Sequence, residues 1–173
     1  MSAVEFSRIV KVRPQPPQHI DLNAGEAERS ALAVRFGISE VRGLSATLSF
    51  EADGPAVSAK GRMTAEVVQT CAVSGEDFAV RIDEPLDLRF VPQGSLTVDE
   101  EEEVELSSDD PDEIEYDGES FDAGEAVAQS LGLAIDPYAE GPNADLVRRE
   151  AGIVDEDAPT GPLAEALAAL KRS

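Results

Sequence analysis

The sequence contains few of the residues from which most catalytic and metal sites are built. Its 173 residues include one histidine, one cysteine and no tryptophan. A single cysteine excludes an internal disulfide framework, and a single histidine leaves little material for a zinc site or a Ser-His-Asp relay. Phosphate-binding, dinucleotide-binding, hydrolase-elbow and zinc-protease motifs are also missing. We therefore expect no enzyme, no cofactor and no metal.

Long apolar runs are missing as well. No window approaches the ~20 consecutive apolar residues of a membrane-spanning helix. The residues after Met1 also lack the basic stretch and apolar run of a secretory signal. We expect a cytoplasmic protein that does not associate with membranes.

Cations are scarce, and one long stretch has none. The chain has 14 Lys+Arg against 36 Asp+Glu, for a formal net charge of −22. Residues 90–147 carry 18 acids and no lysine or arginine. Nucleic-acid binding is disfavoured because cations provide most of the affinity for phosphates, so a basic protein is the expected partner. Direct RNA contact would need a local basic surface, for which the candidates are Arg8, Lys11, Arg13, Lys60 and Arg62.

The first ninety residues contain the clearest strand patterns. Apolar and polar residues alternate near residues 4–12, 44–52, 56–72 and 77–91, which is typical of half-buried strands. This parity predicts that seven apolar residues are buried together: Leu48, Met63, Val67, Val80, Ile82, Leu86 and Leu88. It predicts that Arg62, Glu66, Arg81 and Asp83 face solvent. Pro85 has no N–H, so the last strand is either at a sheet edge or broken there.

Capping residues indicate the helices. Asn23 is expected to cap a helix through about Phe36, which Gly37 ends. Asp122 and Glu125 occupy capping-box positions for a helix over residues 123–135. Pro162 opens a short helix in a C-terminal tail over residues 148–173. The expected fold is α+β, with an antiparallel β-sheet packed against two or three helices in a single domain over residues 1–173.

Residues 99–120 are expected to form an acidic, flexible insert in this domain. Its large apolar residues are too few to offset the entropy of ordering the segment. A solvating loop, a docking surface for a basic protein and a metal site are the alternatives. A calcium loop starting at Asp110 fails, because its fifth and sixth positions are Ile114 and Glu115. The candidate partner-binding residues are Glu100, Glu101, Glu102 and Glu103.

Two single residues could also carry chemistry. His19 follows a proline-rich stretch, and an ordinary surface or packing role is expected for it because a specialised histidine usually has a partner. Cys71 lies on the apolar face of its strand, and Ser74 stands where a Cys-x-x-Cys pair would have its second cysteine. A packed cysteine of modest reactivity is the expectation.

The order of these segments resembles that of a known family. The run Gly61–Ser74, the strand Phe78–Phe90, the acidic segment and the stretch Phe121–Tyr138 together resemble the YceD family of large ribosomal RNA subunit accumulation proteins. The resemblance extends to Ile20–Asn23 and Pro162–Leu167. Many members of the family have a second cysteine three residues after the first and more near the C-terminus. Their absence here is expected of an alphaproteobacterial branch.

The resemblance implies a non-enzymatic role in the synthesis, processing or stability of large-subunit ribosomal RNA. Together with the acidic charge, it favours a factor that binds a basic ribosomal or assembly protein, alone or within a pre-ribosomal particle. One alternative is a regulator or enzyme of phospholipid or fatty-acid synthesis, because genes of this family often lie beside ribosomal-protein genes and phospholipid-synthesis genes. The other is a general scaffolding domain. Nothing in the sequence indicates the oligomeric state.

Overall fold

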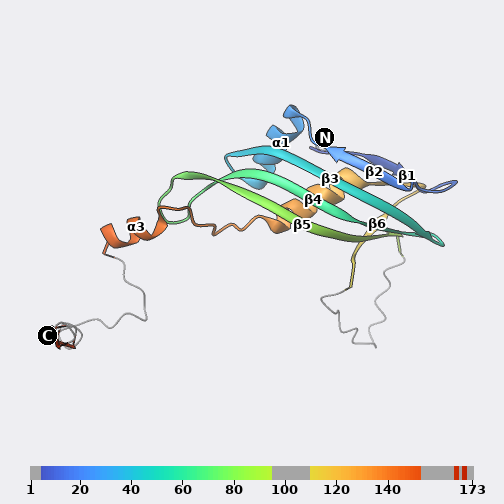
Figure 1. The fold of residues 1–173 in the computed structure, drawn as a ribbon. Coiled ribbons are helices and arrows are strands. Elements are labelled where there is room, and N and C mark those ends of the chain that lie inside the picture. Colours follow the sequence, from blue (N-terminus) through green and yellow to red (C-terminus); the bar gives the residue numbers. More distant parts are fainter. Residues whose placement is uncertain (1–4, 95–109, 153–165, 168, 171–173) are drawn as a thin grey trace.

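A five-stranded sheet forms the centre of the protein (Figure 1). The computed structural model describes residues 5–94, 110–152, 166–167 and 169–170. The strand order is β2-β3-β4-β5-β6, with antiparallel neighbours except for the parallel pair β5 and β6. These strands are β2 (His19–Asn23), β3 (Glu40–Asp53), β4 (Ala56–Thr70), β5 (Asp77–Pro92) and β6 (Asp112–Tyr116). A two-stranded sheet pairs β1 (Ile9–Lys11) with β7 (Ser120–Asp122).

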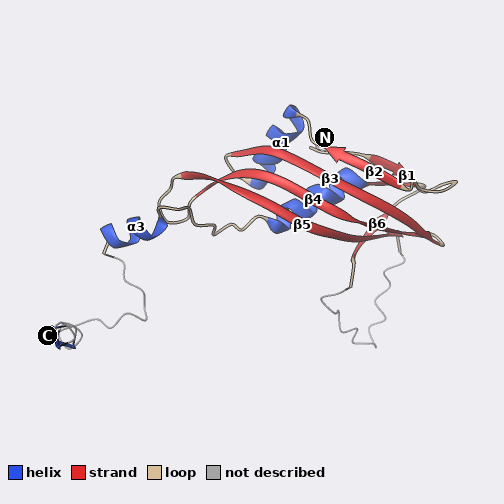
Figure 2. Ribbon diagram, viewed as in Figure 1, coloured by secondary structure: helices blue, strands red, loops and turns tan. Residues whose placement is uncertain are grey.

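Helices cover one face of the large sheet. Figure 2 shows α2 (Ala123–Ala134) crossing behind the long strands. The helix α1 (Glu26–Phe36) packs against β3, and its Leu32 belongs to the same core as Leu131 of α2. A third helix, α3 (Ala144–Glu150), follows α2 and was not expected from the sequence. The α+β prediction is confirmed.

The period-two pattern of the long strands sets the core. Leu48, Met63 and Val67 have no exposed surface, and Leu88 is almost fully buried. The polar residues of the same strands face solvent as predicted: Arg62, Glu66, Arg81 and Asp83. Pro85 lies within a continuous β5 and pairs with Arg62 of β4, while β6 pairs only with the stretch from Leu88 onward. Of the two alternatives for Pro85, the sheet edge is therefore correct.

The boundary expected for the acidic insert needs correction. Residues 95–109 lie outside the described residues, but Asp112–Tyr116 forms β6 beside the end of β5. Ile114 and Tyr116 are two residues apart, so both reach the same side of the strand and pack on the core. The Tyr116 hydroxyl also donates a hydrogen bond to the carbonyl of Pro55. Two well-placed apolar residues and a backbone ladder thus order a stretch whose charge predicted flexibility.

The N-terminal elements also differ from expectation. The predicted strand over residues 4–12 is reduced to β1, which pairs with β7 and stands outside the large sheet. The stretch His19–Asn23 is a strand, so Asn23 does not cap α1. Gly25 occupies the N-cap, and its N–H donates to the carboxylate of Glu28 over 2.7 Å. The predicted end of α1 is confirmed, because Gly37 adopts φ 66°.

Asp122 joins the N-terminal segment to the start of α2. As predicted, its side chain caps the helix by accepting the Glu125 N–H over 3.1 Å. The same carboxylate accepts the Arg8 N–H over 2.8 Å and the Ser7 hydroxyl over 2.6 Å. The Arg8 guanidinium in turn reaches the Glu28 carboxylate over 2.7 Å, which joins the segment to α1. One cap therefore connects three parts of the chain.

Close backbone packing at Gly124 leads to a stability prediction. A Cβ atom there would lie 2.7 Å from the Arg8 nitrogen and 2.9 Å from the Phe6 oxygen, both of them backbone atoms. We expect Gly124→Ala to lower the free energy of unfolding by about 1–3 kcal/mol through overpacking. Urea denaturation measures the change.

Gly132→Ala in the same helix is the matched control. Its added Cβ would meet a ring atom of Phe36 at 3.0 Å, and a side chain can move where backbone cannot. Both substitutions gain the same helix propensity. Equal stabilities of the two variants would contradict the proposed backbone clash.

Candidate interaction surfaces

The candidate residues Glu100, Glu101, Glu102 and Glu103 lie outside the described residues. Their segment connects the end of β5 to the start of β6, so both of its attachment points lie at one edge of the sheet. That edge has further acids at Asp112, Glu113 and Glu115. Of these, Glu113 approaches Arg89 at 3.9 Å. The acids expected to bind a partner therefore connect to an edge that is itself acidic.

The open face of the sheet carries a network of exposed ion pairs. Arg62 donates to Asp83 over 2.5 Å, and Arg42 lies between Glu40 and Glu66. These carboxylates raise the pKa values of Arg42 and Arg62. Exposed pairs of this kind contribute little to stability because solvent screens them. Their main effect is to neutralise cations on this face.

The basic candidates therefore do not form one surface. Arg8 is bound to Glu28, Lys60 approaches Asp87 at 3.9 Å, and Arg62 pairs with Asp83. Lys11 and Arg13 remain, both exposed at and just after β1. Lys11 and Arg13 alone are too few to neutralise several phosphates, so direct RNA binding has little support.

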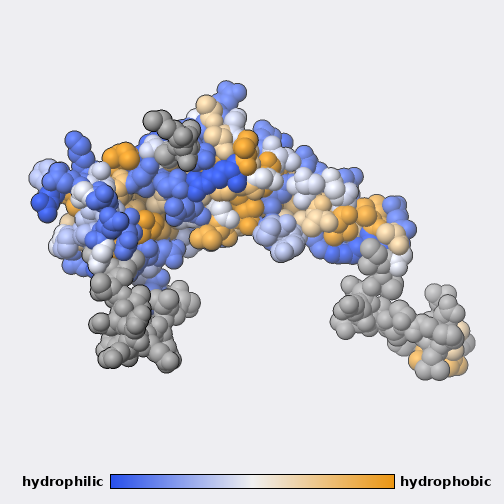
Figure 3. Space-filling view, turned by 180° about the vertical axis from the view of Figure 1, so that it is seen from behind, coloured by the Kyte–Doolittle hydropathy of each residue, from blue (hydrophilic) through white to orange (hydrophobic). Residues whose placement is uncertain are grey.

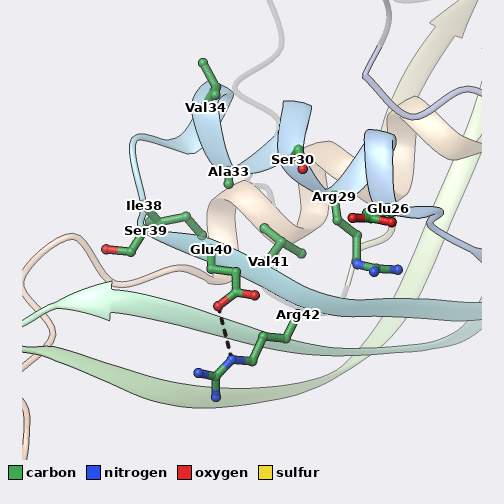
Figure 4. A pocket seen from close by; sticks show the side chains of 10 residues that line it. All are labelled: Glu26, Arg29, Ser30, Ala33, Val34, Ile38, Ser39, Glu40, Val41 and Arg42. Carbon is green, nitrogen blue, oxygen red and sulfur yellow. Dashed lines mark hydrogen bonds and ion pairs between the residues drawn. The ribbon is translucent and has the colours of Figure 1, made fainter.

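Two grooves flank the N-terminal elements. Figure 4 shows the first, of about 430 Å³, between α1 and the start of β3. Its lining includes Val34, whose side chain is 83% exposed, and the Glu40–Arg42 ion pair. The second, of about 760 Å³, lies between β1 and β2 and has an apolar floor that includes Ile20. Neither groove brings together the nucleophile, base and oxyanion donors that catalysis would require.

Cys71 occupies an unusual turn between β4 and β5. Its side chain is buried, and its Sγ accepts N–H groups from Val73 at 3.4 Å, Ser74 at 3.3 Å and Gly141 at 3.2 Å. The Ser74 hydroxyl and these N–H groups lower the pKa of the thiol from 9.0 to about 7. The burial agrees with the expected packed cysteine, but the surroundings of the sulfur are polar. The spacing from Cys71 singled out Ser74 in the sequence, but not as a donor to the sulfur, and Gly141 is too distant in sequence to have been found.

His19 lies on the exposed surface of β2. Its ring nitrogens approach Asp21 at 3.1 Å and Ser49 at 3.4 Å. Within the described part of the chain, no three His, Cys, Asp or Glu side chains are grouped to hold a metal ion. None of the described helices is long and apolar enough to cross a membrane.

The comparison with family models decides the family. Residues 59–171 match the model described as large ribosomal RNA subunit accumulation protein YceD. The chain belongs to the YceD family. The match begins within β4, after β3, and includes Cys71, β5 and the capped helix α2, which carried the resemblance in the sequence. No curated protein and no solved structure matches the chain. The alphaproteobacterial branch stays a prediction.

The polar surroundings of Cys71 predict which substitutions it tolerates. Serine keeps an oxygen that can accept the three N–H groups, whereas valine leaves them without an acceptor. A buried donor left unsatisfied costs about 1–3 kcal/mol, and these three donors are only part-buried, so Cys71→Val should be less stable than Cys71→Ser by about 1–3 kcal/mol in total. Urea denaturation of the two variants tests this, and equal stabilities would show that the N–H contacts contribute nothing.

The lowered thiol pKa also predicts a pH dependence. The folded pKa is about 7 against an ordinary value of 9.0, so between these values the unfolded chain holds more protons. The free energy of unfolding should therefore gain a contribution as pH rises from 7 to 9, and lose it as pH falls through 7. Cys71→Ser should lack this contribution. Identical pH profiles for the two proteins would refute the lowered pKa.

Proposed function

We propose that this protein is a non-enzymatic, cytoplasmic factor that supports the accumulation of large-subunit ribosomal RNA. Membership of the YceD family carries the proposal, since the family description names that role. The family supports a part in ribosome biogenesis without stating a mechanism. The distribution of charge over the protein indicates how such a factor could act.

The charge distribution favours action through a basic protein. Seven cations of the described residues lie within 4.0 Å of a carboxylate: Arg8, Arg35, Arg42, Lys60, Arg62, Arg89 and Arg148. Few cations of the described residues then remain for phosphates, while the chain has 36 acids against 14 lysines and arginines. An acidic surface could hold a basic ribosomal protein until its RNA site forms, because it offers some of the negative charge that RNA will supply.

The segment that contains Glu100, Glu101, Glu102 and Glu103 is proposed to make the first contact. Changing all four to glutamine keeps their size and polarity while removing four charges. Attraction between exposed charges is screened over ~8 Å at physiological salt, so the change should slow association and flatten its salt dependence. Large-subunit ribosomal RNA should also fall in cells that carry the variant. Affinity purification at two salt concentrations, with protein and RNA identified, measures both effects.

A second variant with the same charge change is the control. It carries glutamine at four exposed glutamates of the folded domain, namely Glu26, Glu40, Glu51 and Glu150. If both variants weaken binding equally, the net charge of the protein determines binding and the segment has no specific role. If the protein recovers phospholipid-synthesis enzymes without ribosomal proteins, the alternative connected with lipid synthesis replaces the proposal.

A further inference from the structure

The lower border of the sheet in Figure 1 is an open strand edge. On its outer side, β5 is paired with β6 only from Leu88 to Pro92. The turn at the other end of β5 is covered, because Gly141 lies against Phe78. Between residues 79 and 87 no strand of the described chain pairs with this side. An edge of this kind presents unpaired N–H and C=O groups on which another strand can form a ladder. Pro85 has no N–H, so a ladder along this stretch lacks a donor at that residue.

The edge carries a charge on the side where the pattern calls for an apolar residue. Val80, Ile82, Leu86 and Leu88 point toward the helix-covered face, and Glu84 occupies the same parity between them. Its neighbour across the ladder is Met63, which is fully buried, yet Glu84 itself is exposed. An inward-pointing charge on an edge strand opposes unspecific strand pairing. A strand that covered Glu84 would have to supply a cation.

A cavity of about 290 Å³ lies beside this edge, between β5 and α2. Its lining residues include the apolar Met63 and Leu86 and the acidic Glu84, Asp87 and Asp112. Leu133 of α2 also lines the cavity with its side chain 84% exposed. Seen from the helix side, the protein shows separate apolar patches among hydrophilic residues (Figure 3). Leu133 is thus an exposed apolar anchor next to unpaired backbone and three acids.

We propose that the β5 edge from residue 79 to Asp87 binds an extended, basic segment of a partner protein as an added strand. The partner's backbone forms the ladder, an apolar side chain covers Leu133, and a lysine or arginine pairs with Glu84 and Asp112. This inference rests on the proposed function, since it names a surface on which a basic ribosomal or assembly protein would dock. Backbone pairing supplies affinity, and the carboxylate inside the apolar row supplies selectivity.

The acidic residues of the edge favour a cationic peptide over a second copy of the chain and over RNA. A second copy of the chain would bring its own Glu84 and Asp112 against the same residues, and opposed like charges destabilise a strand pair. RNA has no strand-forming backbone, and its phosphates would be repelled by the same carboxylates. A cationic extended peptide satisfies both the ladder and the acids.

The test uses the full chain labelled with ¹⁵N and a capped lysine-valine peptide. In this peptide lysine and valine take turns at every second position with threonine between them, so that one face of the strand presents both a cation and an apolar side chain. The peptide has about eight residues, which is within the usual length of a strand. Binding should shift the amide signals of residues 79–84, 86 and 87 and slow their hydrogen exchange. A glutamate-valine peptide of the same length should not bind. A lysine-valine peptide N-methylated at alternate residues keeps its charge but cannot form the ladder, so it should also fail. Equal binding by the methylated peptide would overturn strand addition.

Two matched pairs of variants locate the site. Leu133→Asp should weaken binding about tenfold through loss of the apolar contact, while Val34→Asp, 83% exposed on α1, should have no effect. Glu84→Gln should weaken it about two- to fivefold and reduce its salt dependence, whereas Glu26→Gln should not. Equal effects within either pair, or amide shifts centred on another element, would refute the assignment of the edge.

The outcomes distinguish this inference from the proposed function. If the protein recovers assembling large subunits from cells but Leu133→Asp recovers them equally well, the edge is not the docking site and the proposed function stands. If the lysine-valine peptide binds at the edge as described but no ribosomal component is recovered, the docking mode stands and the ribosomal role fails.

Discussion

The need to cover one face of a long sheet determines how this protein is built. β3, β4 and β5 have 14, 15 and 16 residues and carry apolar side chains on one side along most of their length. Burying that side stabilises the fold, and the polar side can remain in water. The chain supplies the cover from α1, α2 and the β1-β7 pair, whose Phe121 stacks on Phe90. The remaining elements are arranged around this requirement.

The cap of α2 is the point at which the cover is attached. Asp122 ends β7 and begins the helix, so one carboxylate serves a strand end, a helix N-terminus and the N-terminal segment. The absence of a side chain at Gly124 allows that segment to cross the first turn of α2. Arg35 of α1 adds a bidentate contact to Glu125 over 2.8 and 3.0 Å, and this contact raises the Arg35 pKa. This contact joins the last turn of α1 to the first turn of α2. The acidic residues at the start of α2, Asp122 and Glu125, therefore hold the helix to the N-terminal segment and to α1.

Sequence patterns predicted the elements that local physics determines. The alternation in β3 to β5 and the capping residue Asp122 were sufficient to place the core and α2. β2 was missed because a five-residue strand directly before a helix gives little periodic signal, and β6 was missed because its charge outweighed Ile114 and Tyr116. Both are stabilised by pairing with distant strands, which no local pattern reveals. For the candidate site, the sequence could indicate only some of the groups around the Cys71 sulfur, since Ser74 is near in sequence and Gly141 is not. The prediction for Glu100–Glu103 remains untested.

The parallel strand β6 explains why part of the β5 edge is open. An antiparallel hairpin would have returned from Pro92 along the whole of β5 and closed its outer side. A parallel return must cross back before pairing, and β6 then reaches only the last five residues of β5. The described part of this edge carries acids of its own, among them Glu84 on β5 and Asp112 on β6. An open edge is a liability unless charge restricts what can pair with it. If the β5 edge binds a cationic strand as proposed, the carboxylates that oppose unspecific pairing also select that strand, so protection of the edge and choice of partner follow from the same residues.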